Sequence, residues 1–369
     1  RENLEHFKRE NASWLNDYSL YISLKNHFNG LPWNEWAHDI KNREHGAMEH
    51  YRNELADDIE YHNFIQFLFF KQWGDVKRYA NENGIKIIGD IPIFVAADSS
   101  DAWANPEIFL FDEERKPVKV AGVPPDYFSA TGQLWGNPLY NWQKLKETNY
   151  SWWVERVRAN LSTCDIIRID HFRGFEAYWA VPYGDDTAIN GQWEPGPGID
   201  LFNAIKSQLG ELPIIAEDLG LMTQGVIDLR EATGFPGMKI LGFAFDSGEE
   251  NDYLPHTYTK NCVVYTGTHD NDTLIGWFQK AKEEDRQFAR DYLNSRSDDE
   301  IHWDAIRGAW SSVANMAISP VQDFLGLGSE ARINTPGVAA GNWQWRLKHG
   351  VLTDELAERI AKLTKVYSR

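Results

Sequence analysis

Two hydrophobic patterns alternate along the chain. Short runs rich in β-branched residues, typical of buried strands, are separated by longer stretches with apolar positions at helical spacing. The clearest helical stretch runs from about Asp57 to Asn83 and ends at Gly84, a residue type that favours the turn after a helix. Six runs predict strands, near 86–92, 165–170, 213–217, 239–245, 262–268 and 315–320.

Strands that alternate with helices predict a parallel sheet with right-handed crossovers. We therefore expect an α/β fold, a (β/α)8 TIM-type barrel with helical and loop insertions. It would form a single domain over residues 1–369, with peripheral helices at about 1–56 and 281–312. A closed barrel needs eight strands. Because residues 1–80 show mostly helical patterns, the six candidates predict an incomplete barrel whose first two strands lie upstream of Arg1.

The stretch from Ala96 to Trp142 shows no clear period and mixes aromatic with polar residues. It is too long to serve only as a connection between two elements, and such long loops are usually functional. Aromatic residues make up 14% of the chain, and many stand beside Gly, Asn, Pro or Asp. Core packing explains most of them, but loop aromatics among amides and carboxylates also suit sugars, which offer a flat apolar face and a hydroxyl rim.

Composition narrows the classes of partner. The net charge is −18, with 55 acidic and 37 basic residues, so we expect no nucleic-acid or membrane partner. No apolar run approaches the roughly 18 residues of a membrane helix. The two cysteines, Cys164 and Cys262, each head a candidate strand and indicate buried reduced thiols. These features fit a cytoplasmic protein, or a plastid protein if the source is a plant.

Several predicted strands end on a carboxylate, and these are Asp90, Asp170, Glu217 and Asp270. In a parallel barrel the carboxyl ends of the strands form the catalytic face. An aspartate after a strand is also a common turn or N-cap residue, and for any single one the two interpretations are evenly balanced. The joint pattern favours a functional cluster, because Arg168, His171 and His269 accompany it.

Two chemistries could use this cluster. Asp170-His171 and His269-Asp270 resemble pairs of metal ligands, but their spacing matches no tight ligand motif, and we expect no catalytic metal. Glycoside chemistry fits better, since it uses one carboxylate nucleophile and one carboxylic acid, about 5–5.5 Å apart when configuration is retained. The chain carries no Walker loop and no GxGxxG after a strand, so no organic cofactor is expected.

Each carboxylate then receives a hypothetical role. Arg168 and Asp170 lie two residues apart on one strand and so point to the same side, where the guanidinium would keep Asp170 ionised and aimed as a nucleophile. Glu217 suits the general acid/base, which needs a raised pKa in a drier site. Asp270 with His269 would hold sugar hydroxyls and stabilise the oxocarbenium-like transition state.

At these residues the sequence resembles the 4-α-glucanotransferases called amylomaltase or disproportionating enzyme, distant relatives of the α-amylases. The resemblance covers nearly the whole chain from about Asp57 on. It rests on the motifs GDIPIFVAADSSDAWANPEIF (89–109), GVPPDYFSATGQLWGNPLYNW (122–142), RIDHFRGF (168–175), IIAEDLG (214–220), GFPGMKIL (234–241), TGTHDNDT (266–273) and GSEARINTPG (328–337).

The resemblance implies a nucleophile at Asp170, a general acid/base at Glu217 and a transition-state stabiliser at Asp270. It implies glucose contacts at Asp90, Arg168, His171 and His269, with further substrate-lining positions at Phe243 and Asn334. A flexible loop over the acceptor side would carry Tyr127, Phe128, Gln133 and Trp135. Trp135 could equally be a buried anchor for that loop.

The resemblance also implies an activity, the transfer of a segment of an α-1,4-glucan to the 4-hydroxyl of an acceptor glucan or glucose. α-1,4-Glucans and maltooligosaccharides would be the binding partners. Two other classes stay open. A retaining α-glucan hydrolase of the same fold would release sugar to water, and a non-catalytic glucan-binding protein would have no need of three carboxylates together.

Overall fold

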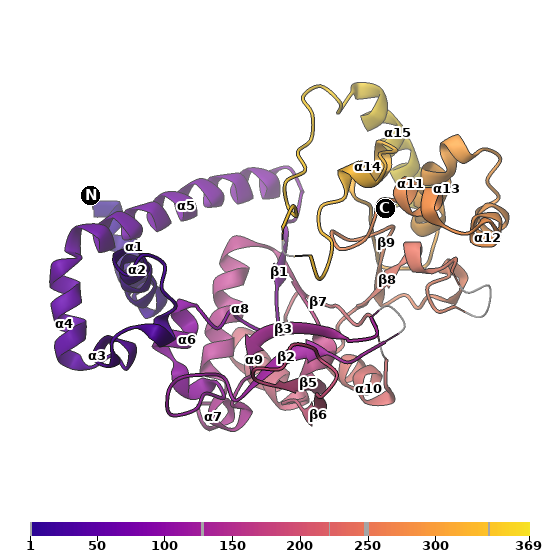
Figure 1. The fold of residues 1–369 in the computed structure, drawn as a ribbon. Coiled ribbons are helices and arrows are strands. Elements are labelled where there is room, and N and C mark those ends of the chain that lie inside the picture. The colour runs from indigo at the N-terminus through magenta and orange to yellow at the C-terminus, as the bar shows by residue number, and fades with distance from the viewer. Residues whose placement is uncertain (1, 127–128, 221, 247–250, 339) are drawn as a thin grey trace. The chain divides into compact units, whose positions relative to one another are not determined.

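A computed structural model describes residues 2–126, 129–220, 222–246, 251–338 and 340–369 (Figure 1). The chain forms two compact units. The first comprises Arg1–Ile214 and Met222–Thr233, and the second Ile215–Leu221 and Gly234–Arg369. The predicted carboxylates are therefore divided, with Asp90 and Asp170 in the first unit and Glu217 and Asp270 in the second. The division of residues 1–369 into domains predicted above stays a prediction.

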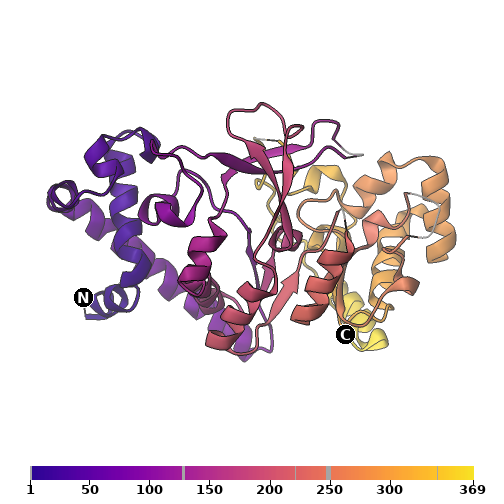
Figure 2. The same ribbon diagram turned by 90° about the horizontal axis from the view of Figure 1, so that it is seen from below.

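The first unit opens with helices alone, as the sequence predicts for residues 1–80. These are α1 (Glu2–Glu10), α2 (Ala12–His27), α3 (His38–Lys41), α4 (His45–Glu54) and α5 (Ala56–Glu82), with a 3-10 turn at Trp33–Glu35. Helices α1 to α5 lie together in both views (Figure 1, Figure 2), and α2 packs on α5. The α5 helix ends where predicted, because Gly84 adopts φ +75° and lets the Ile85 N–H reach the Ala80 carbonyl at 2.9 Å.

Parallel strands follow. β1 (Ile88–Ile91), β4 (Ile166–Ile169) and the start of β7 (Ile214–Ala216) form a sheet in that order, and β1 pairs with β4 in parallel register, with Asp90 opposite Arg168. Helices between and after these strands match the predicted crossovers, and they are α8 (Ser151–Thr163), α9 (Ile199–Leu209) and α10 (Gln224–Thr233). The register is what brings an aspartate of one strand beside an arginine of the next.

A four-stranded antiparallel sheet was not predicted. Its strands are β2 (Lys119–Val123), β3 (Gln133–Pro138), β5 (Ala177–Pro182) and β6 (Gln192–Pro195), in the order β3-β2-β5-β6. Two of them lie inside the stretch 96–142 that shows no period, together with the short helices α6 (Ser100–Ala104) and α7 (Trp142–Glu147) and a 3-10 turn at Pro106–Ile108. Glycine, proline and asparagine interrupt the alternation in these strands, so the two-residue period is lost.

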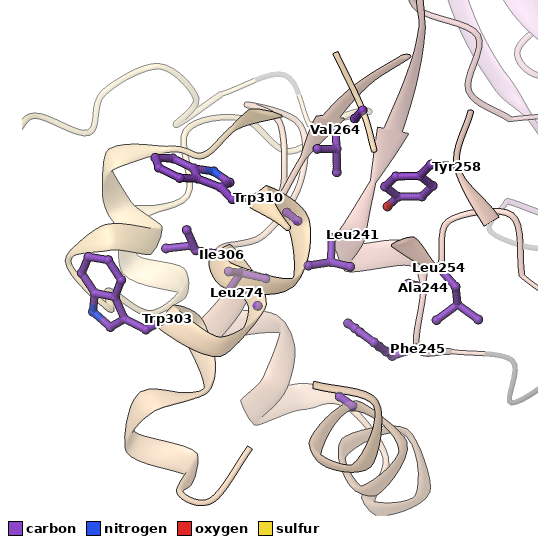
Figure 3. Packing of buried hydrophobic residues seen from close by; sticks show 14 of the residues in the cluster. Leu241, Ala244, Phe245, Leu254, Tyr258, Val264, Leu274, Trp303, Ile306 and Trp310 are labelled. Carbon is purple, nitrogen blue, oxygen red and sulfur yellow. The ribbon is translucent and has the colours of Figure 1, made fainter. Parts of the chain in front are cut away.

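The second unit contains the remaining parallel strands, β8 (Gly237–Ile240), β9 (Cys262–Tyr265) and β10 (Met316–Ile318), in the order β10-β9-β8. Its helices are α11 (Leu274–Lys280), α12 (Glu283–Leu293), α13 (Ile301–Trp310), α14 (Val321–Phe324) and α15 (Asp354–Tyr367). Figure 3 shows the core of this unit, a buried cluster to which Leu241, Val264 and Ile306 of α13 all belong. Each of the six predicted strand runs thus overlaps a strand.

Two local predictions need correction. The run 239–245 is a strand only to Ile240, because Leu241–Phe243 form a 3-10 turn that buries Leu241. The sequence Ser297-Asp298-Asp299-Glu300 also predicts a capping box, in which Glu300 would reach back to the Ser297 N–H, but this box is incomplete. Ser297 accepts from the Asp299 N–H at the start of a 3-10 turn, while Glu300 pairs with Arg359 instead of reaching back.

Cys164 and Cys262 are both buried, as predicted. Within the described residues, no helix combines the length and the apolar character needed to cross a membrane.

Candidate active site

Arg168 holds two of the predicted carboxylates. Its Nη1 donates to both oxygens of Asp90, at 2.7 and 2.8 Å, and its Nη2 lies 3.1 Å from Oδ1 of Asp170. The Arg168 side chain is only 8% exposed, whereas those of Asp90 and Asp170 are 42% and 40% exposed. A buried guanidinium therefore orients two carboxylates that remain accessible at the carboxyl ends of β1 and β4. This geometry explains why a buried strand carries an arginine and an aspartate on one side.

His171 follows Asp170 directly and leaves the strand in a left-handed conformation with φ +52°. Burial, with a further contribution from the charge of Arg173, lowers the pKa of His171 to about 3. The imidazole is therefore neutral at any working pH. Gly174 leaves room for the ring, since a Cβ there would lie 3.0 Å from Cδ2 of His171.

Trp135 and Gln133 lie on β3, and Trp135 is 38% exposed. The Trp135 ring meets the His171 ring edge-on, with 4.8 Å between the centroids, and its Nε1 donates to Oε1 of Gln133 at 3.2 Å. The structure thus brings Trp135 and Gln133 beside the Asp170–His171 corner. Tyr127 and Phe128 lie outside the described residues.

In the second unit Glu217 comes directly after β7 and is buried. Its Oε1 accepts from the Leu219 N–H at 3.0 Å, and the neighbouring Asp218 accepts from the Met238 N–H at 2.8 Å. Burial and the charges of Asp218 and Glu217 raise the pKa of Tyr253 to about 12, so this phenol stays protonated beside the carboxylates. Phe243, a predicted lining residue, packs edge-on against Tyr253 with 5.5 Å between the ring centroids.

Asp270 is bound from three sides. Nδ2 of Asn334 donates to its Oδ1 at 2.6 Å, Nε2 of His269 lies 3.4 Å from its Oδ2, and Nη2 of Arg332 donates to its main-chain carbonyl at 2.7 Å. The Asn334 N–H also donates to the His269 carbonyl at 3.1 Å. The segment 332–334 therefore fixes both the side chain and the backbone of Asp270. Asn334 was predicted from the sequence, whereas Arg332, in the same motif GSEARINTPG, was not.

Asn334→Ala is expected to lower kcat about tenfold with little effect on folding. The variant loses one hydrogen bond to a charged carboxylate, worth roughly 1.5–3 kcal/mol, while Arg332 still holds the Asp270 backbone. Initial rates over a range of maltotriose concentrations would measure the effect. Asn342→Ala, in the same loop but without a bond to Asp270, is the matched control. An equal loss of kcat in both variants would show that loop integrity, rather than the bond to Asp270, matters.

The loop that carries Asp270 is anchored by Asp323, which is 1% exposed. One carboxyl oxygen accepts from Thr266 Oγ1 at 2.7 Å and the other from the Leu274 N–H at 2.8 Å, so Asp323 ties both ends of the segment 266–274. Burial, reinforced by the nearby charge of Asp272, raises the pKa of Asp323 to about 6 despite these two hydrogen bonds. Folding therefore favours the protonated carboxyl, which persists up to about pH 6.

Asp323→Asn is expected to stabilise the protein increasingly as pH rises. The unfolded Asp has a pKa of about 3.9, so between about pH 4 and 6 the folded state holds the extra proton, and the stability it brings is lost as pH rises through the folded pKa. Asparagine mimics the protonated acid, donating to Thr266 and accepting from Leu274. Urea unfolding at pH 4 and pH 7 should show the advantage of the variant growing by about 2 kcal/mol.

Asp272→Asn is the control, because its effect on stability should change with pH in the opposite direction. Burial opposes ionisation there, but hydrogen bonds from Lys280 and Ser329 outweigh it and hold the pKa of Asp272 below its usual value. The stability it contributes is present above the unfolded pKa and lost as pH falls through the folded one. Asp272→Asn should therefore cost more stability at pH 7 than at pH 4. The same pH trend in both variants would contradict the assignment.

A family model for the 4-alpha-glucanotransferases matches residues 1–353. The chain belongs to the 4-alpha-glucanotransferase family. The 4-alpha-glucanotransferase of Clostridium butyricum is 53% identical over 370 residues, covering 100% of this chain and 76% of that relative. The chloroplastic/amyloplastic 4-alpha-glucanotransferase of Arabidopsis thaliana is 45% identical over 361 residues, covering 97% of this chain and 63% of the relative. Among solved structures, amylomaltase from Streptococcus agalactiae in complex with acarbose matches with a TM-score of 0.96 and 40% identity, over 99% of this chain and 74% of that one.

Membership of the 4-alpha-glucanotransferase family confirms the resemblance found in the sequence, and with it the (β/α)8-type barrel fold and the class of enzyme. The family assignment also decides against a purely glucan-binding protein. The roles of single residues stay predictions, supported by the contacts of Arg168, Asp270 and their neighbours. Within the part of the chain that the structure describes, no cluster of His, Cys, Asp or Glu side chains is arranged to hold a metal ion.

Proposed function

We propose that this member of the 4-alpha-glucanotransferase family transfers a segment of an α-1,4-glucan to the 4-hydroxyl of a second glucan or of glucose, with net retention of configuration. The observation that carries the proposal is the support given to each of the three carboxylates. Asp170 is oriented by Arg168, Glu217 is buried beside Tyr253, and Asp270 is bound by Asn334. Each follows the end of a parallel strand, where barrel enzymes carry their catalytic groups.

In the first step Asp170 attacks the anomeric carbon of the donor. The bond from that carbon to the glycosidic oxygen breaks, and Glu217 gives its proton to the leaving oxygen. The product is a glucosyl ester on Asp170 with inverted configuration. Because Arg168 holds Oδ1 of Asp170, the carboxylate meets the substrate in one orientation, so less entropy is lost in reaching the transition state.

In the second step the 4-hydroxyl of the acceptor attacks the same carbon. Its proton passes to Glu217, the ester bond to Asp170 breaks, and the second inversion gives net retention. Transfer exceeds hydrolysis only where an acceptor is bound and water is excluded. Trp135, partly exposed beside His171, offers an apolar surface for the acceptor side.

The charges around the reacting carbon suit a cationic transition state. Asp270 supplies negative charge and acceptor oxygens for sugar hydroxyls. His171 is neutral, so it can bond a hydroxyl without placing positive charge beside the oxocarbenium-like centre. A protonated imidazole in that position would oppose the reaction, and the burial that lowers its pKa prevents this.

The test is incubation of the 369-residue chain with maltotriose, followed by separation of the products by size. Transfer predicts glucose together with maltooligosaccharides longer than maltotriose. Glucose and maltose without longer products would instead identify a retaining hydrolase of the same fold. For the site of action we propose the cytoplasm, or the plastid if the source is a plant, and fractionation with a tagged chain would test this.

A further inference from the structure

Trp343 is an exposed tryptophan next to Asp270 that core packing does not explain. It is 64% exposed, and its ring centroid lies 5.1 Å from that of His269, with 38° between the planes. His269 in turn contacts Asp270. The main-chain N–H of Trp343 donates to the carbonyl of Ile333 at 2.8 Å, and Ile333 directly precedes Asn334. The indole therefore stands beside the residues that bind Asp270.

The backbone at Trp343 is also strained. Its φ of +60° places a bulky side chain in the left-handed region, which costs an L-residue roughly 1–2 kcal/mol. Packing of the ring does not offset this strain, because an exposed indole gains little from the hydrophobic effect. Strained residues that persist without a packing reason are typical of binding and active sites.

Hydrogen bonds of Asn342 hold the backbone next to Trp343. Oδ1 of Asn342 accepts from the Thr335 N–H at 3.0 Å, and its Nδ2 donates to the Val338 carbonyl at 2.8 Å. Asn342 thus ties the backbone next to Trp343 to Thr335 and Val338. A ring on an ordered backbone binds a ligand face at a smaller entropic cost than a ring on a disordered one.

We propose that the Trp343 indole is a stacking platform for one glucose unit of the glucan, adjoining His269 and Asp270. This proposal rests on the proposed function, since it places part of the same substrate. The indole face is apolar, and the pyranose ring is the substrate's flat apolar surface. His269 and Asp270 would bind hydroxyls at the rim of the same sugar.

Trp193 provides the matched control, because its exposure already has an explanation. It is 40% exposed, but the Arg173 guanidinium lies 3.9 Å from its ring centroid, and Trp179 packs edge-on at 5.2 Å. Trp193 therefore stabilises the antiparallel sheet. The Trp193→Ala variant therefore shows how glucan binding responds to the loss of an exposed tryptophan that is not proposed to contact the glucan.

The experiment compares Trp343→Ala, Trp343→Phe and Trp193→Ala with the parent chain. KM and kcat are measured for maltotriose, and Kd for maltoheptaose by calorimetry in a Glu217→Gln background, where the glucan is not consumed. Trp343→Ala should raise KM and Kd about tenfold with kcat nearly unchanged, the signature of lost uniform binding. Trp343→Phe should keep both within about threefold, since an aromatic face remains. Trp193→Ala should leave Kd unchanged.

The melting temperature should not fall in Trp343→Ala, because the ring is exposed and alanine has the same backbone preference. Unchanged KM and Kd in Trp343→Ala, with an active parent chain, would overturn the platform and leave the proposed function standing. A lower melting temperature that Trp343→Phe does not restore would also overturn it, by showing a structural role. A parent chain that neither binds maltoheptaose nor converts maltotriose would overturn the proposed function, and the platform with it.

Discussion

Asp170→Asn is expected to lower kcat for disproportionation by about 10⁴-fold or more, the scale on which covalent enzymes lose activity without their nucleophile. The amide oxygen can still accept from Arg168, so the carboxyl end of β4 should keep its geometry. What disappears is the negative oxygen that forms the glucosyl ester. Glucose release from maltotriose, followed over hours at high enzyme concentration, would measure the residual rate.

Asp165, at the opposite end of the same strand, is the matched control. Its carboxylate accepts from the Ile87 N–H at 2.8 Å and from Nδ2 of Asn81 at 2.9 Å, which makes its role structural. Asp165→Asn should lower stability and leave kcat per folded molecule unchanged. Activity of Asp170→Asn comparable with that of Asp165→Asn would remove Asp170 from the mechanism.

The stereochemistry of an external nucleophile gives a second, independent test. In Asp170→Ala the side chain leaves space for azide on the face from which the carboxylate would attack. With α-glucosyl fluoride as donor, a single displacement by azide should give β-glucosyl azide. Formation of the α-product instead would mean that another group still forms the covalent intermediate.

The parallel strands were predictable from sequence because of where they lie. Strands such as β4 and β9 are buried, so they appear as short runs rich in β-branched residues, IIRI and CVVY. The antiparallel sheet was not predictable in this way. β2 pairs with β5, whose residues lie more than 50 positions further along the chain, and neither strand shows a clear alternation. Its existence follows from pairing between distant segments, which no local window records.

The candidate site likewise has a part that could be predicted from the sequence and a part that could not. Asp170 and Glu217 could be found because each stands where an apolar run stops. The bond from Arg168 to Asp90 depends on the register of β1 against β4, and the bond from Arg332 to Asp270 joins residues 62 apart. Nothing in the sequence pointed to Tyr253, because its importance arises from its burial beside two carboxylates. Residue type and strand ends thus predict which groups react, whereas the groups that orient them emerge only from tertiary packing.

Glu217→Ala is expected to lower kcat for maltotriose by about 10²- to 10⁴-fold, the usual contribution of a general acid/base. The sugar leaving group is a poor one unless it is protonated, so the first step should suffer most. A donor whose leaving group needs no proton separates this role from any other. With α-glucosyl fluoride the first step should recover, and turnover should then be limited by the second step, in which the acceptor hydroxyl lacks a base.

Azide needs no base, so adding it should restore turnover of α-glucosyl fluoride by Glu217→Ala. Because azide would attack the ester on Asp170 from the face opposite to it, the product should be α-glucosyl azide, the reverse of the result for Asp170→Ala. Asp218→Ala is the control, since Asp218 binds the Met238 N–H and its loss should not be rescued by azide. Rescue of both variants, or a β-product from Glu217→Ala, would show that Glu217 is not the proton donor. Opposite product configurations from the two catalytic variants would assign nucleophile and acid/base to their residues in one pair of measurements.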